Sequence, residues 1–332
     1  MIEYKNGIHI TGTRLWLDAR KKVGFSFVSH AHTDHAVRHE EILCTKETAK
    51  FYQHRYGKAK FHILEYNHPR KLEGLKVKLF PSGHILGGAQ ILLEKDGVRI
   101  VYTGDFKLRE SLTAKGAEIK KCDILILEST FGLPRYVFPP AREVHAQMVD
   151  FVETAQKRGE IPIFLAYSLG KAQEAMKILS KSGCLLSVHG SIYPIAKIYE
   201  EFGVKFNKWE CYKSGNLEGK VMIVPPWVKG SRIVEKIPRK RIAILTGWAV
   251  DPGAKKRYGV DEVIPLSDHA DFMELMAYVK KAQPQKVFTV HGFPKFVDYL
   301  KDAGFDAEPL KESTKVETSM SKGLTVNYDL FS

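Results

Sequence analysis

Short apolar runs, each ending at a polar or glycine-rich segment, dominate the first part of the chain. Runs of this length that end in this way are typical of β-strands. The predicted strands are Leu15–Leu17, Phe25–Ser29, Val77–Phe80, Ile91–Leu93, Arg99–Tyr102 and Ile124–Leu127. The amino-terminal part of the chain is therefore predicted to be rich in β-sheet.

The middle of the chain has a different pattern. Apolar residues recur at helical spacing in Arg142–Lys157 and Lys171–Lys181, and the strand-like runs Pro162–Leu165 and Val221–Val224 accompany them. This alternation is typical of an α/β unit. After it, the pattern predicts a strand, a helix and a last buried strand: Ile242–Leu245, about Asp271–Lys281, and Lys286–Val290.

Length and charge narrow the class of protein. A chain of 332 residues exceeds the size at which one hydrophobic core usually stops growing, so two domains are expected. The chain holds no apolar run long enough to cross a bilayer, and its first seven residues lack the pattern of a secretory signal, which together predict a soluble cytoplasmic protein without a membrane partner. A net charge of +13 favours polyanionic partners such as nucleic acid.

The four cysteines are scattered and form no C-x-x-C pair. This spacing argues against a disulfide framework and against a thiolate metal site. We therefore expect Cys44, Cys122, Cys184 and Cys211 to be core residues.

A cluster of metal-binding side chains follows the strand that starts at Phe25. Residues 30–35 read His-Ala-His-Thr-Asp-His, so His30, His32, Asp34 and His35 share one short loop. Residues two apart in an extended backbone project to the same side, which lets His30 and His32 bind one cation while Asp34 and His35 turn toward a second. Packing gives no reason to crowd such polar groups together. Isolated histidines elsewhere in the chain are interpreted as surface or core groups.

Two glycine-containing turns at predicted strand ends add further candidate ligands for a metal site. Ser82-Gly83-His84 supplies a third imidazole, and Thr103-Gly104-Asp105 supplies a carboxylate, whose two oxygens can bridge two cations. Either turn alone would be a weak signal. Their order after the histidine cluster favours a shared metal site.

These motifs together resemble those of the metallo-β-lactamase-fold hydrolases, and Asp18 matches the first motif of that superfamily. Glu128, His269 and His291 match the three additional motifs of its β-CASP branch, whose members are nucleases. The resemblance implies an α/β fold: an αββα sandwich formed by residues 1–135 and 262–332, with a β-CASP α/β domain inserted at residues 136–261.

The sequence around these motifs most resembles that of the DNA ligase-associated exonucleases and the related archaeal mRNA 3′-end processing factors. The likeness spans nearly the whole chain. It includes residues 129–134, 166–173, 188–190, 247–248 and 266–271. One departure is the basic run after Gly247-Trp248, where that branch has a run of arginines and this chain has Lys255-Lys256-Arg257.

The resemblance and ligand chemistry together imply a two-metal site for zinc or manganese, with iron also compatible. The implied ligands are His30, His32 and His84 for one cation, and Asp34, His35 and His291 for the other, with Asp105 shared. Asp34 also counts among the catalytic residues. His269 would be the general acid, oriented by Glu128. For Asp18, orienting a ligand histidine and capping a turn are both open.

A weaker signal lies where Ser168-Leu169-Gly170-Lys171 opens a predicted helix. Backbone N–H groups and the helix dipole attract phosphate at such a place, so Ser168, Gly170 and Lys171 are candidate contacts to a substrate phosphate. The alternative is a capped helix with a tight glycine turn.

The main functional hypothesis is a DNA exonuclease, with endonuclease activity also open, that acts in DNA repair. Single-stranded DNA ends would be favoured, and a DNA ligase or a helicase could be a partner. An RNA-processing nuclease of the same fold is the alternative. A small-molecule metallohydrolase would leave Glu128 and His269 without a role, and an inactive binding protein would be expected to lack ligands that this chain retains.

Overall fold

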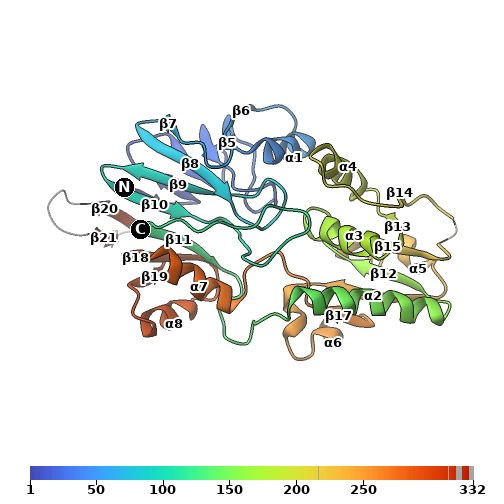
Figure 1. Cartoon of the computed structure of the whole chain (residues 1–332). Helices are drawn as coiled ribbons and strands as arrows, with labels where there is room; N and C mark the ends of the chain where they lie inside the picture. Colours follow the sequence, from blue (N-terminus) through green and yellow to red (C-terminus); the bar gives the residue numbers. More distant parts are fainter. Residues whose placement is uncertain (216, 313, 319–323, 329–332) are drawn as a thin grey trace. The chain divides into compact units, whose positions relative to one another are not determined.

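The computed structural model describes residues 1–215, 217–312, 314–318 and 324–328, which form two compact units (Figure 1). The first unit comprises residues 1–108, 115–133 and 270–332, and the second comprises residues 109–114 and 134–269. The second unit thus extends beyond the predicted boundary at residue 261. It does so because Glu262–Ile264 pairs with a strand of that unit's sheet.

The first unit contains two mixed sheets. One has the order β21-β20-β1-β2-β3-β4-β5-β6, with strands Leu324–Tyr328, Thr314–Thr318, Ile2–Tyr4, Ile8–Ile10, Leu15–Leu17, Phe25–Phe27, Glu41–Cys44 and Lys60–Ile63. The other has the order β19-β18-β11-β10-β9-β8-β7, with strands Ala307–Pro309, Lys286–Gly292, Ile124–Ser129, Val98–Tyr102, Ala89–Lys95, Leu75–Pro81 and Arg70–Leu72.

Alternating side chains of these strands form separate cores. Ile124 and Ile126 of β11 belong to a cluster that joins the inner faces of both sheets, whereas Leu125 and Leu127 belong to a cluster shared with helices α7 (Phe272–Ala282) and α8 (Phe296–Asp302). A third cluster packs helix α1 (Lys46–Tyr56) against the other sheet. Successive residues of a strand point to opposite faces, so β11 is buried on both. The layers confirm the predicted αββα sandwich.

The second unit is an α/β domain around a parallel sheet. Its strand order is β14-β13-β15-β12-β16-β17, with strands Trp209–Cys211, Leu185–Val188, Lys220–Val224, Ile161–Leu165, Lys240–Leu245 and Glu262–Ile264. Its helices are α2 (Ala141–Lys157), α3 (Lys171–Lys181), α4 (Tyr193–Glu201), α5 (Arg232–Glu235) and α6 (Ala254–Tyr258), with 3₁₀ turns η1 (Pro226–Val228) and η2 (Gly247–Val250). The predicted α/β alternation is confirmed.

The cysteines follow the prediction only in part. Cys44 and Cys122 are buried and free, but Cys184 and Cys211 are partly exposed. The prediction that all four are core residues is therefore wrong. Cys184 directly precedes β13, outside the buried part of that strand, and Cys211 ends β14, an edge strand of the second unit's sheet. Among the described residues, no helix is both long enough and apolar enough to cross a membrane.

Candidate metal centre

Two glycines in left-handed backbone turns place the acidic and imidazole groups of the site. Gly83 has φ +74°, and a Cβ there would lie 2.1 Å from the carbonyl oxygen of Lys107. Gly104 has φ +52°, and a Cβ there would lie 2.7 Å from the Ser29 side chain. Only glycine fits such positions without strain. The turns deliver His84 and Asp105, the residues that directly follow them.

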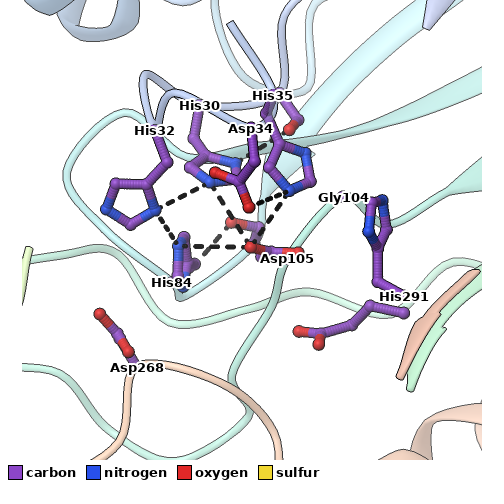
Figure 2. A network of polar contacts seen from close by, with 12 residues as sticks. His30, His32, Asp34, His35, His84, Gly104, Asp105, Asp268 and His291 are labelled. Atoms are coloured by element: carbon purple, nitrogen blue, oxygen red, sulfur yellow. Dashed lines mark hydrogen bonds and ion pairs between the residues drawn. The ribbon is translucent and has the colours of Figure 1, made fainter. Parts of the chain in front are cut away.

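Four predicted ligands converge in the first unit. The Nε2 atoms of His30 and His84 lie 3.0 and 3.1 Å from Nδ1 of His32, and Asp105 Oδ2 lies 3.6 Å from His30 Nε2 and 3.8 Å from His84 Nε2. Figure 2 shows the three rings turned toward one another and toward Asp105. All four ligand atoms lie within 4.8 Å of one another. The first predicted ligand set is thus assembled around one point.

The second predicted set is more open. His35 Nε2 lies 3.3 Å from Asp105 Oδ2 and 3.7 Å from Asp34 Oδ2, and the Asp34 side chain is 71% exposed. The His291 ring lies 5.1 Å from the His35 ring, centroid to centroid, and its Nδ1 lies 3.2 Å from the Arg20 guanidinium. Asp105 faces both sets, as a shared ligand would.

Asp18 holds the rings of two of these histidines. Its carboxylate accepts hydrogen bonds from His35 Nδ1 (2.7 Å), the Ser29 hydroxyl (2.6 Å), the Ser29 N–H (2.7 Å) and the Tyr102 hydroxyl (2.8 Å). The Ser29 oxygen in turn lies 3.0 Å from His30 Nδ1. Because the Nδ1 atoms of both rings face these partners, their Nε2 atoms are left to face Asp105. Of the two roles open for Asp18, this geometry favours orientation of ligand histidines.

The imidazoles of the site differ in pKa, because each has a different balance of burial and nearby charge. Burial lowers the pKa of His30 well below its usual value, and the nearby His35, His84 and His32 lower it further. Burial also acts to lower the pKa of His35, but the carboxylates of Asp105 and Asp18 outweigh it and hold this pKa well above the usual value. Burial lowers the pKa of His291. His30 and His291 are therefore neutral at neutral pH, which is the form that binds metal.

The donor set fits divalent cations. His30, His84 and Asp105 are each no more than 5% exposed, so their converging nitrogens and oxygens have lost most of their contact with water. Burying such polar groups together is costly unless something satisfies them. A cation accepts several lone pairs at once, and mixed imidazole and carboxylate ligands suit zinc, manganese or iron.

Glu128 lies at the end of β11 in the first unit and is fully buried. Its Oε1 accepts a hydrogen bond from the Phe106 N–H (2.9 Å), and its Oε2 accepts one from the Thr130 hydroxyl (2.6 Å). His269 belongs to the second unit, where its N–H donates to the Ser267 hydroxyl. The proposed action of Glu128 on His269 stays a prediction.

The segment predicted to contact phosphate has partners within the second unit. The Lys171 ammonium is buried and lies 2.9 Å from Asp268 Oδ1. The Gly170 N–H donates to the Gln173 side chain (2.8 Å), and the Ser168 hydroxyl lies 3.1 Å from that of Ser191. These contacts favour the alternative of a capped helix start, and the phosphate contact stays a prediction.

Sequence reasoning missed three residues of the first unit that support the site. Ser29 links Asp18 to His30, Tyr102 donates to Asp18, and the Arg55 guanidinium donates to the Ala31 carbonyl (2.6 Å) within the histidine loop. Ser29 and Tyr102 lie directly before metal-binding motifs, which was an available signal. Arg55 lies on α1, far from any motif in the sequence, so no signal in the sequence pointed to it.

Comparisons with known proteins agree with this geometry. Residues 253–313 match the family described as the Zn-dependent metallo-hydrolase RNA specificity domain. The chain is 37% identical over 320 residues to a probable DNA ligase of Opitutus terrae, a match that covers 95% of this chain and 32% of that protein. This chain thus spans about a third of the length of that relative.

Other relatives are named as ribonucleases. An RNase J-like protein of Methanocaldococcus jannaschii is 27% identical over 352 residues, which is 82% of each chain. The endoribonuclease ysh-1 of Neurospora crassa is 28% identical over 185 residues, or 54% of this chain and 20% of that one. With the αββα sandwich, the inserted α/β unit and the convergent histidines, these matches show that the chain belongs to the β-CASP family of metallo-β-lactamase-fold nucleases.

Proposed function

We propose that this protein is a two-metal nuclease that hydrolyses phosphodiester bonds of DNA, acting as an exonuclease in DNA repair. The observation that carries the proposal is the convergence of His30, His32, His84 and Asp105 within 4.8 Å, with His35 Nε2 3.3 Å from the same Asp105 carboxylate. One cation would be held by the first three histidines, and a second by Asp34, His35 and His291. Asp105 would be shared between them.

Divalent cations held by these residues would activate water and neutralise charge on the phosphate. The residues of the chain supply the geometry for this chemistry. Asp18 fixes the ring of His35 directly and that of His30 through Ser29, so their Nε2 atoms stay aimed at the site. Rigid orientation of ligands strengthens metal binding.

The leaving oxygen needs a proton, and we assign its delivery to His269. Glu128 would favour the protonated imidazole, because an opposite charge stabilises the charged form of a histidine. A general acid of this kind contributes about 10²- to 10⁴-fold to a rate. Replacing His269 should therefore reduce turnover far more than it reduces substrate binding.

The preference for DNA is supported by the match to the probable DNA ligase, which covers 95% of this chain. A DNA ligase joins ends, so a nuclease that trims single-stranded ends is a natural companion, and a ligase or helicase is the proposed partner. A second candidate is an RNA-processing nuclease. It is supported by the match to the RNA specificity domain at residues 253–313 and by the RNase J-like relative.

The test compares DNA and RNA strands of one sequence, each labelled at the 5′ end in one sample and at the 3′ end in another. Wild-type protein and the Asp105→Ala variant are incubated with each strand in zinc and in manganese. Release of labelled mononucleotides from one end of DNA, absent in the variant, supports a DNA exonuclease. Preferential loss of RNA would overturn the DNA assignment, and equal cleavage by Asp105→Ala would overturn the metal site.

A further inference from the structure

The second unit gathers aromatic side chains along one edge of its parallel sheet. Carboxyl ends of parallel strands meet at the same edge. Four strands of this sheet, β13, β15, β12 and β16, are followed within three residues by an aromatic residue: His189, Trp227, Tyr167 and Trp248, respectively. Aromatic residues therefore recur along the carboxyl edge of this sheet.

Two of these rings are turned to solvent. The Trp227 side chain is 72% exposed and that of Tyr167 is 61% exposed, and among the residues that the structure describes they are the two aromatic members of the exposed large hydrophobic group. Tryptophan and tyrosine are usually buried over most of their surface. Two such rings at one sheet edge indicate a contact surface.

Hydrogen bonds and ring contacts join the segments that carry these rings. The Ser191 hydroxyl lies 3.1 Å from the Ser168 hydroxyl, beside Tyr167, and 2.9 Å from His189 Nδ1. The His189 ring meets the Trp227 ring edge-on at 5.4 Å between centroids. The ends of β12, β13 and β15 therefore form one connected surface.

The two exposed rings lie where the strand order reverses. Strands β12 and β15 are neighbours, with Leu165 paired to Val224. The chain leaves β12 toward β13 on one side, but leaves β15 toward β16 on the other. In open parallel sheets, a crevice outside the carboxyl ends of such a strand pair is the usual place for a ligand.

The charge around this edge favours a polyanion. The Lys171 ammonium lies 5.1 Å from the centre of the Tyr167 ring, but its charge is balanced by Asp268, so the positive charge offered to a ligand near this edge comes from other residues. Exposed Lys213 follows β14 and exposed Arg232 follows η1, the turn that carries Trp227. Rings that stack on bases, set among basic groups, are how proteins bind single strands without reading sequence.

From these observations we propose that this edge binds single-stranded nucleic acid, with Trp227 and Tyr167 stacking on its bases. The proposal rests on the proposed function for the class of substrate, and it adds a binding surface outside the metal centre. Its contacts are to bases and not to the scissile phosphate. It therefore predicts an effect on affinity that does not depend on metal.

The experiment measures binding of a fluorescein-labelled 15-residue thymidine oligonucleotide to protein kept in a chelator, by fluorescence anisotropy. We expect Trp227→Ala and Tyr167→Ala each to weaken binding roughly 5- to 100-fold, because stacking on an aromatic ring contributes this much per base. Trp227→Phe should restore much of the loss. An abasic oligomer of the same length should bind wild type and both alanine variants equally.

Leu185→Ala is the matched control, because this exposed residue begins β13 and so lies at the opposite edge of the same sheet. It should bind like wild type, and circular dichroism should show all variants folded. Wild-type affinity in Trp227→Ala and Tyr167→Ala would overturn the proposal, as would equal losses with the abasic oligomer.

The same variants separate this inference from the proposed function. Hydrolysis of bis(p-nitrophenyl) phosphate, a small diester without bases, should be unchanged in Trp227→Ala. If the protein binds the oligonucleotide through these rings but cleaves neither substrate, the nuclease assignment fails and the binding surface stands. If both alanine variants cleave oligonucleotides with the wild-type KM, the surface fails and the nuclease assignment stands.

Discussion

The metal centre of the first unit and the Ser168–Lys171 segment of the second unit are both polar clusters that the sequence marks out, but they differ in how their polar atoms are satisfied. In the metal centre, imidazole nitrogens and the Asp105 carboxylate converge on one another. In the segment, Lys171 is paired with Asp268 and the Gly170 N–H is bonded to Gln173. Metal-binding atoms that converge on one point indicate a site for a ligand. Polar groups that are already matched, donor to acceptor or cation to anion, indicate a structural role.

The largest expected effect comes from Asp105→Ala. Asp105 faces both predicted ligand sets, so its loss should weaken both and remove several kcal/mol of transition-state stabilisation. We expect phosphodiester hydrolysis to fall by about a thousandfold or more. Rates measured at saturating manganese check this, and a fall of less than about tenfold would contradict the shared-ligand role.

Lys171→Met should act on stability. It would leave the buried Asp268 carboxylate without its ammonium partner, and breaking a buried pair in this way costs about 3–5 kcal/mol. Urea unfolding followed by tryptophan fluorescence measures the loss, and adding Asp268→Asn should recover part of it. A variant of normal stability whose DNA affinity and salt dependence both fall would instead establish the phosphate contact.

Asp18→Asn should weaken metal binding in the first unit. The substitution keeps the shape of a residue that accepts from His35, Ser29 and Tyr102 but removes its charge. Loss of such an orienting group typically lowers metal affinity about 10- to 100-fold. Competition with a chromogenic chelator measures the change. Tyr102→Phe, which removes one of the donors to Asp18, should have a smaller effect, and an equal effect would indicate general loss of packing.

His39 is a buried histidine outside both clusters, and burial lowers its pKa to about 4. The unfolded chain, with the ordinary pKa of 6.5, takes up a proton first as the pH falls. The stability is therefore full above about pH 6.5 and is lost progressively toward pH 4, by about 2 kcal/mol at pH 5.

His39→Asn tests this dependence, because an amide oxygen can still accept the bond that Nδ1 receives from the Val23 N–H but does not titrate. The free energy of unfolding at pH 7 and pH 5 should differ less in the variant than in wild type. An unchanged difference would mean that other groups cause the acid sensitivity.

Strand and helix positions with clear periodicity were predictable. The predicted helix at residues 171–181 and the predicted strand at residues 162–165 match α3 and β12 almost residue for residue, because local pattern alone determines them. Three-residue strands such as β1 and β2 are too short to carry a pattern. The pairing of β1 with β20 joins opposite ends of the chain, and no local signal announces such a contact.

The site shows the same limit. The order of the motifs predicts that His30, His32, His84 and Asp105 lie together, because one cation needs several such ligands at once. The relay from Asp18 through Ser29 to His30 depends on how two strand ends face each other, and the ion pair of Lys171 with Asp268 depends on tertiary packing. Neither can be derived from spacing.

The central claim, that the buried histidines and Asp105 bind divalent cations, is tested most directly by metal content. Purified protein and the Asp105→Ala variant are stripped with a chelator, dialysed against zinc or manganese, and measured by plasma mass spectrometry. The account predicts about two ions per chain for wild type and fewer for the variant, as a two-metal site requires. Wild-type protein that retains no metal above the level of the variant would contradict it.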